Sequence, residues 1–177
     1  MRKLLILMLF AYPLSIFAQK DTVFWRDNAI LRAGELEITF KMKDYKHYAS
    51  LNHPKLVEMI GGEAAFAKML EEQMTTLEQS IKIDSMDFGD PYQFTKCDSD
   101  SIINCLLPQT MLIRLDDTLK MRSTVYLLGV SEDRGNTWYF LDASNGATYL
   151  DALVPNRCKD FIIPERQQAF ITEKKKK

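Results

Sequence analysis

The chain has 177 residues, of which 46% are hydrophobic and 27% charged, and its formal net charge is −1. This balance is typical of a globular protein with its own core and excludes a disordered or strongly basic chain. A near-neutral, slightly acidic protein lacks the positive field that nucleic-acid binding requires. We therefore expect one ordinary folded domain and no nucleic-acid partner.

The first residues have the pattern of a secretory signal peptide. Arg2 and Lys3 precede the apolar run Leu4–Phe10, and the small residue Ala18 ends the segment. We expect cleavage after Ala18 and an exported chain, periplasmic or secreted, with a buried N-terminal helix as the alternative. Pro13 interrupts the apolar stretch too early for a membrane anchor, and no other stretch reaches spanning length.

After this segment, we expect a single domain over residues 19–164 and a mobile, lysine-rich tail over residues 165–177. Removal of Arg2 and Lys3 leaves 21 basic and 24 acidic residues, a net charge of −3. The run Lys174–Lys177 contributes four of the positive charges, so the body without it carries −7. A solvated tail is the ordinary role of such a run.

Apolar residues spaced three and four apart predict helices over residues 22–42 and 63–79. Asp44 is expected to begin a shorter helix between them, and Pro54 suits the first turn of another. The pair Gly61-Gly62 ends that second short helix.

From residue 81 the pattern changes to strands. We expect strands over residues 81–88, 92–97 and 102–107, followed by a bulge or sheet edge at Pro108. A short helix over residues 147–153 and an extended piece at residues 161–164 complete the prediction.

The clearest signal is a meander over residues 109–142. Strands 109–115 and 119–130 alternate in polarity, and a three-residue connection places Ile113 opposite Met121 and Arg114 opposite Lys120. Trp138 begins a third strand that is apolar on both faces, so we expect the sheet either to be covered on both sides there or to curl around something.

Cys97, Cys105 and Cys158 all lie in the part expected to be exported. A turn at residues 98–101 pairs Cys97 with Ile102 and leaves Cys105 too far away for a disulfide. We therefore expect three unlinked cysteines that behave as small hydrophobic residues. An intramolecular disulfide is the alternative.

Helices followed by antiparallel strands indicate the α+β class. The segment Lys43–Met74, KDYKHYASLNHPKLVEMIGGEAAFAKMLEEQM, resembles the opening of the nuclear transport factor 2-like superfamily. This is the cystatin-like cone, with SnoaL-like and ketosteroid isomerase-like members. The resemblance implies N-terminal helices packed in the concavity of a bent antiparallel sheet. The piece HPKLVEMI stands where many members have a first strand, and the part from Asn145 lies beyond the common domain.

Relatives of this kind include isomerases and dehydratases that combine a carboxylate base with a tyrosine. No candidate here matches a family catalytic motif, so we assign no catalytic residue. The candidates are Asp44, Tyr45, His47 and Tyr48 near the first helices, and Asp84, Asp87 and Asp142 on strands. The two histidines, His47 and His53, lack the spacing of metal ligands, and no motif indicates a cofactor.

Aromatic and methionine side chains are the other candidates, because they suit an apolar ligand. Nine are expected to line the interior of the cone: Phe40, Tyr45, Tyr48, Met59, Phe66, Met69, Tyr126, Trp138 and Phe140. Ordinary core packing is the alternative for all nine. We expect a non-catalytic binding module for a small apolar molecule or for a protein on the sheet face, including a homodimer through that face. The alternative is an isomerase- or dehydratase-like enzyme.

Overall fold

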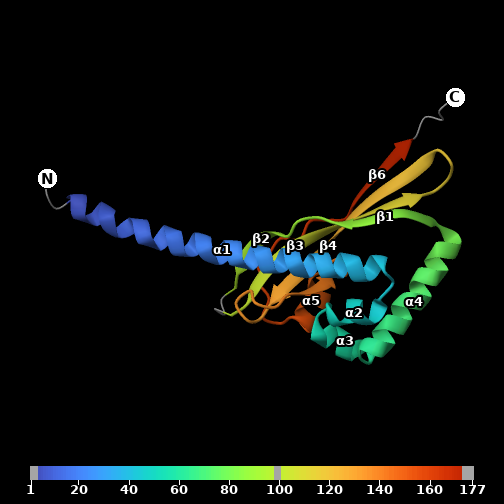
Figure 1. Ribbon diagram of the computed structural model, residues 1–177, viewed down its shortest axis with the longest axis horizontal. Helices are drawn as coiled ribbons and strands as arrows, with labels where there is room; N and C mark the ends of the chain where they lie inside the picture. Colours follow the sequence, from blue (N-terminus) through green and yellow to red (C-terminus); the bar gives the residue numbers. More distant parts are fainter. Residues whose placement is uncertain (1–3, 98–100, 173–177) are drawn as a thin grey trace.

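The computed structural model describes residues 4–97 and 101–172, with side chains from Thr22 onward. The predicted signal peptide therefore lies outside the residues whose side chains are described. The described chain forms five helices and six strands (Figure 1): α1 Leu4–Lys41, α2 Tyr45–Ser50, α3 Pro54–Ile60, α4 Glu63–Ser80, β1 Lys82–Phe88, β2 Tyr92–Lys96, β3 Ile103–Arg114, β4 Leu119–Ser131, β5 Tyr139–Asp142, α5 Ala147–Leu153 and β6 Gln167–Thr172.

The sheet is built around the long hairpin of β3 and β4. β1 and β2 pair with the two halves of β3, while β6 and β5 pair with the two halves of β4, and every pairing is antiparallel. The sheet curls into a half-barrel, with α1 across it and α2, α3 and α4 along one side (Figure 1). The predicted α+β class with a bent antiparallel sheet is therefore confirmed.

The predicted register of the hairpin is also confirmed. Ile113 pairs with Met121 and Arg114 with Lys120. The three-residue connection is closed by Asp116, whose Oδ1 accepts hydrogen bonds from the backbone N–H groups of Thr118 (2.7 Å) and Leu119 (2.8 Å). An aspartate that bonds the backbone two and three residues ahead is a standard way to hold a tight turn.

Pro108 lies inside β3, although the sequence indicated a bulge or edge there. It pairs with Tyr126 of β4, while β1 ends and β2 begins on its other side. The Pro108 carbonyl accepts a hydrogen bond of 2.9 Å from the N–H of Gly89, in the break between those two strands. Because the N and O atoms of one residue in an antiparallel strand point to the same side, the missing N–H of Pro108 faces this break.

Both faces of the central sheet are buried. One face packs Leu107, Leu127 and Phe140 against Ala29 and Leu36 of α1. The other face packs its leucines against α5 and the segment after it. Trp138 and Phe140 are 1% and 0% exposed. The prediction of a sheet covered on both sides near Trp138 is therefore confirmed.

The short helices begin and end as predicted. Asp44 caps α2 by accepting a hydrogen bond from the backbone N–H of His47, and Pro54 occupies the first turn of α3. Gly61 ends α3 in the left-handed conformation, with φ of 105°.

The expectation of three unlinked cysteines is wrong. Cys97 and Cys158 form a disulfide across a sequence separation of 61 residues, and Cys105 is free and buried. The Cys97 N–H donates to the Ile102 carbonyl (2.9 Å), so the predicted local pairing is present. The partner comes from the segment after α5, and sequence spacing carries no information about that contact.

Gln167–Thr172, within the segment expected to be a tail, forms β6, which pairs with β4 from Leu119 to Thr124. Five of the six side chains in QQAFIT are exposed, so its sequence shows only weak alternation of apolar and polar residues. The sequence therefore did not predict this strand. Residues 173–177 lie outside the described chain. Across the described residues, none of the helices combines the length and the apolar character that spanning a membrane demands.

Candidate functional site

The nine side chains expected to line a cone interior fall into separate places. Phe40, Tyr45 and Tyr48 form an edge-on aromatic cluster where α1 meets α2, with ring centroids 6.2 Å apart for Phe40–Tyr45 and 5.6 Å for Phe40–Tyr48. Trp138 and Phe140 lie fully buried in the core beneath α1. The remaining four are Phe66, which is buried, Met69 and Tyr126, which are half-buried, and Met59, which is exposed. None of the nine lines the cavities described below.

Three of the four candidate carboxylates have structural partners. Asp44 caps α2, and Asp87 is exposed at 3.4 Å from Lys41 Nζ. Asp84 lies 2.9 Å from Arg114 Nη2 and 3.1 Å from Lys120 Nζ. Hydrogen bonds from Arg114, and then Lys120, hold the pKa of Asp84 below its usual value. A carboxylate held ionised by two cations is a weak general base.

Asp142 is the carboxylate closest to the chemistry that an isomerase would need. Its side chain is exposed, and its Oδ1 accepts a hydrogen bond of 2.8 Å from the Ser144 N–H. Burial raises the pKa of the Tyr48 phenol, and the charge of Asp142 raises it further. Burial and Asp142 act in the same way on the pKa of Tyr149. Both phenols are therefore neutral donors near one carboxylate, but that carboxylate is in water.

A cleft of about 480 Å³ lies beside α3, and we call it the α3 cleft. Four structural parts form it: the end of α2 and the segment after it, α3 with the glycine pair that follows, the first residue of α4, and the first residue of β5. Its lining residues are Ser50, Asn52, Pro54, Val57, Glu58, Gly61, Gly62, Glu63 and Tyr139. The sequence singled out none of these side chains as functional.

An unusual backbone contact brings β5 to α3. Asn52 forms a parallel bridge with Phe140, in which the His53 N–H donates to the Phe140 carbonyl and the Phe140 N–H donates to the Leu51 carbonyl, both at 3.1 Å. The bridge places Tyr139 against the start of α3. Gly61 and Gly62, with φ of 105° and 95°, then turn the chain sharply into α4, and both line the cleft without side chains to fill it.

His53 lies behind the lining, between Asn52 and Pro54. It is 5% exposed, and neither ring nitrogen has a hydrogen-bond partner among the described residues. Burial lowers the pKa of His53, so the ring is neutral at physiological pH. Its ring packs edge-on against Tyr139, with centroids 6.3 Å apart. Tyr139 therefore contacts the buried imidazole on one side and lines the cleft on another.

The charges that line the α3 cleft are both negative. Glu58 and Glu63 are exposed at its rim, and no lysine or arginine is among its lining residues. The ammonium group of the nearby Lys55 donates a hydrogen bond of 2.7 Å to the Ala152 carbonyl. Pro54, Val57 and the Tyr139 ring supply apolar walls. This combination suits a compact apolar group attached to a cation or a hydrogen-bond donor.

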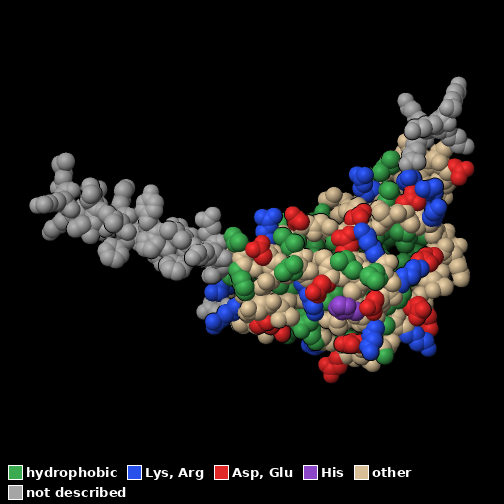
Figure 2. Space-filling view, viewed as in Figure 1, with side chains coloured by type: hydrophobic (Ala, Val, Ile, Leu, Met, Phe, Trp, Pro, Cys, Tyr) green, Lys and Arg blue, Asp and Glu red, His purple; other side chains and the backbone are tan. Residues whose placement is uncertain are grey.

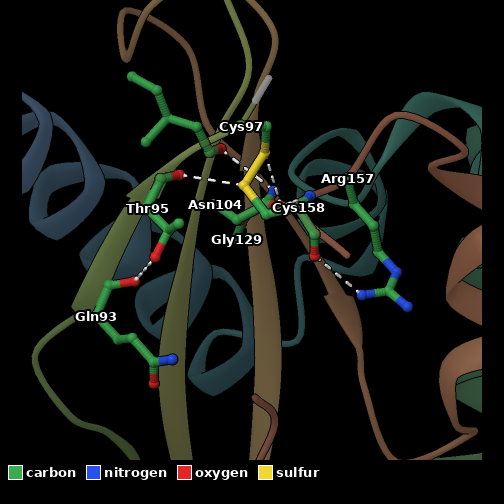
Figure 3. The surroundings of a disulfide bond; sticks show 8 residues. Gln93, Thr95, Cys97, Asn104, Gly129, Arg157 and Cys158 are labelled. Atoms are coloured by element: carbon green, nitrogen blue, oxygen red, sulfur yellow. Dashed lines mark hydrogen bonds between the residues drawn. A yellow bond between two sulfur atoms is a disulfide. The ribbon is translucent and has the colours of Figure 1, made fainter. Parts of the chain in front are cut away.

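A second candidate lies at the disulfide. Arg157 and Lys159, on either side of Cys158, line two adjoining cavities of about 370 and 430 Å³. Asp151 pairs with both, at 2.7 Å from Arg157 Nε and 2.9 Å from Lys159 Nζ, and leaves one positive charge in the group. Asn104 Oδ1 accepts a hydrogen bond of 2.8 Å from the Cys158 N–H, and Arg157 points away from the disulfide (Figure 3). We interpret this region as a structural cross-link that joins the end of β2 to the segment after α5.

A cavity of about 580 Å³ lies between the end of α4 and the tip of the β3–β4 hairpin. Arg114, whose guanidinium pairs with Asp84, is among the side chains that line it. Among the described residues, no group of three or more His, Cys, Asp and Glu side chains is placed to hold a metal ion.

No protein-family model matches the chain, and neither a curated protein nor a solved structure matches it.

Proposed function

We propose that the chain is an exported, non-catalytic binding module, and that the α3 cleft holds a compact apolar ligand with a cationic or hydrogen-bond-donating end. The observation that carries this proposal is the lining: apolar walls from Pro54, Val57 and Tyr139 below a rim of Glu58 and Glu63. The glycine turn and the bridge from Asn52 to Phe140 build the cleft into the fold, so little ordering is needed on binding.

We also propose membership in the nuclear transport factor 2-like superfamily. The support is the order of elements, the curled antiparallel sheet and the Lys43–Met74 segment. Ligands of that superfamily sit inside the cone, whereas the α3 cleft lies at the edge of the sheet beside β5. The proposed site therefore differs from that location, and α3 supplies much of its lining.

The test uses the exported chain and matched pairs of ligands. Arylalkyl amines are compared with the corresponding alcohols by calorimetry and by the shift in melting temperature, because a ligand that binds only the folded state raises it. We expect the amines to bind more tightly than the alcohols. Glu58→Gln with Glu63→Gln should remove that preference, and Ser50→Trp should block binding by filling the cleft.

Glu72→Gln is the matched control, because Glu72 is exposed on α4 away from the cleft. Binding unaffected by Ser50→Trp would show that the ligand sits elsewhere. The absence of a shift with every amine and alcohol would overturn the proposal.

The enzyme alternative rests on Asp142 and its two tyrosines. If the chain is an isomerase or dehydratase, Asp142→Asn should abolish turnover while binding persists, since a general base contributes about 10²–10⁴-fold in rate. Asp87→Asn is the control, because Asp87 is exposed and pairs with Lys41 instead. Product formed by the wild type and lost only in Asp142→Asn would replace the binding proposal with catalysis.

A further inference from the structure

The outer side of α1 carries a row of exposed apolar side chains among its charged ones. Phe24, Leu31 and Ile38 are 45%, 69% and 58% exposed, and Met42, in the turn directly after the helix, is 75% exposed. Hydrophobic side chains run along the outer side of α1, which crosses the face turned to the viewer in Figure 2. The opposite side of the helix is buried against the sheet. A regular apolar row on the outside of a helix that has already buried its inner face is unusual for a monomer.

The spacing of this row is regular. Phe24, Leu31 and Ile38 are seven residues apart, and Asp27, Gly34 and Lys41 form a second row, displaced by three positions. Rows at positions i and i+3 of a seven-residue repeat lie side by side on one helix face. Together, the two rows form a surface that we call the α1 outer face.

Gly34 lies at the centre of this face. A glycine inside a helix costs about 1 kcal/mol relative to alanine. A Cβ atom placed on Gly34 would meet nothing within 4 Å in the described part of the chain. Packing within one chain therefore does not account for glycine at this position, whereas close approach of a second helix does.

The charges on the second row indicate which helix approaches. Asp27 lies seven residues before Gly34 and Lys41 lies seven residues after it. If two copies of α1 cross antiparallel at Gly34, each Asp27 faces the other copy's Lys41 and Leu31 lies beside the other copy's Ile38. A parallel arrangement would instead place like charges together.

We propose that the α1 outer face binds a second copy of this chain through an antiparallel, two-fold crossing centred on Gly34. Each copy presents the same surface, so the contact closes on itself as a dimer. A membrane is a poorer occupant because Asp27, Glu35 and Glu37 flank the row, whereas membrane-surface helices carry lysine and arginine there. The contact is independent of the α3 cleft, and one helix face is small for an interface, so we expect a reversible dimer.

The exported chain is examined by sedimentation velocity over a wide range of concentrations. We expect a monomer–dimer equilibrium that Leu31→Glu abolishes and Ile162→Glu leaves intact. Ile162 is the matched control, since it is 74% exposed and lies far from α1 in the sequence. Near-ultraviolet circular dichroism, which reports on the packing of the buried Trp138 and the other aromatic side chains, checks that each variant is folded.

Exchanging the charges at positions 27 and 41 tests whether the two α1 helices cross antiparallel. Asp27→Lys and Lys41→Asp should each weaken the dimer by about tenfold or more, because each turns two attractive contacts into repulsive ones. The double variant should restore the wild-type dissociation constant. Lys41 also pairs with Glu37 and with Asp87 of its own chain, so a loss of monomer stability would appear in Lys41→Asp, but it would not be reversed by Asp27→Lys.

Gly34 supplies an independent test of the same proposal. Gly34→Ala should raise the stability of the monomer through helix propensity and weaken the dimer through the added methyl group. A chain that is monomeric at every concentration would overturn the proposal. A dimer that survives Leu31→Glu, or an exchange variant that fails to recover, would also overturn it.

Discussion

Trp25 lies directly against Gly135, so closely that a Cβ atom on Gly135 would stand 2.3 Å from Cδ1 of Trp25. Asn28 of the same helix donates a hydrogen bond of 2.9 Å from Nδ2 to the Gly135 carbonyl, and Arg32 Nε donates one of 3.3 Å to the Trp138 carbonyl. Three successive turns of α1 thus dock on the loop between β4 and β5. That loop therefore contacts α1 in addition to the sheet surface against which the helix packs.

The loop is itself held by a compact set of bonds. Asp133 Oδ1 accepts from Ser131 Oγ and from the Thr137 N–H, both at 2.8 Å. Ser131 Oγ accepts from the Gly135 N–H at 2.8 Å, and Trp138 Nε1 donates to the Gly135 carbonyl at 3.2 Å. Every bond closes within eight residues, so the loop is held by its own local bonds and does not depend on α1 for them.

Gly135→Ala should be more destabilising than Gly146→Ala. Gly135 and Gly146 have nearly equal φ angles, 85° and 86°, so an alanine at either costs about 1–2 kcal/mol in backbone strain. Only Gly135 has a neighbour that the methyl group would strike. We expect this overlap to make Gly135→Ala about 1–3 kcal/mol more destabilising than Gly146→Ala, as measured by urea denaturation.

Trp25→Ala provides the check. In that background, the cost of Gly135→Ala should fall towards the cost measured at Gly146, as expected for two residues that are coupled by contact. Equal costs at the two glycines in the wild-type background would mean that Trp25 moves aside freely.

Trp138→Ala should lower the free energy of unfolding by about 3–5 kcal/mol, the range for removing a large buried aromatic. The indole is 1% exposed, donates to the Gly135 carbonyl and packs edge-on against Phe94 at 5.7 Å. Lys175→Ala in the C-terminal segment is the comparison and should change little. Similar denaturant midpoints for the two variants would contradict the assignment of Trp138 to the core.

The register and the turn of the β3–β4 hairpin could be predicted because their information is local, whereas the continuation of β3 through Pro108 could not. Alternating polarity and an aspartate-closed turn together define one register, and a shift by one residue would exchange the two faces. The short helices were predicted for the same reason, since Asp44, Pro54 and Gly61 act on neighbouring backbone groups.

The candidate site could not be predicted in this way. Tyr139 reaches the α3 cleft only because Asn52 bridges to Phe140, a contact between segments 88 residues apart in sequence. The bond between Cys97 and Cys158 likewise depends on a contact between segments that are far apart in sequence, here by 61 residues. The aromatic side chains chosen from the sequence were identified by type, and type alone does not distinguish a core residue from a pocket residue. The observation that Phe24 faces outward also needs the structure, because the outer row of α1 is as apolar as its buried side.

Removing the disulfide should lower the stability of the fold, but the sheet should still form. A bond that closes a loop across 61 residues restricts the unfolded chain, and its entropic contribution is about 4 kcal/mol. Cys97→Ser with Cys158→Ser should lower the free energy of unfolding by up to this amount. Asn104 still bonds the backbone N–H of residue 158 in the folded variant.

Reducing agent separates the disulfide from other effects of these substitutions. It should destabilise the wild type and leave the double serine variant unchanged, because the remaining Cys105 is buried and burial raises the pKa of its thiol. A double variant that is still sensitive to reductant would place the stabilising bond elsewhere.

His53 should make the fold sensitive to mild acid. Its imidazole is buried without a hydrogen-bond partner among the described residues, and burial lowers its pKa below the ordinary 6.5. Lys55 lowers the pKa further, and Glu132 opposes both effects. The unfolded chain therefore binds this proton more readily than the folded chain does. The contribution of His53 to stability is complete above pH 6.5 and is lost as the pH falls from there towards the folded pKa.

The matched variants are His53→Phe and His47→Gln, which cover both histidines of the chain. Denaturant unfolding at about pH 7.5 and about pH 5 measures how the free energy of unfolding changes with pH. This window covers the range in which histidine titrates. Asp84, whose pKa is lowered from 3.8, loses its contribution only at lower pH, so it does not enter this window. We expect the wild type and His47→Gln to lose stability between the two pH values and His53→Phe to lose much less. A slope that survives His53→Phe and disappears with His47→Gln would assign the acid sensitivity to the exposed histidine on α2.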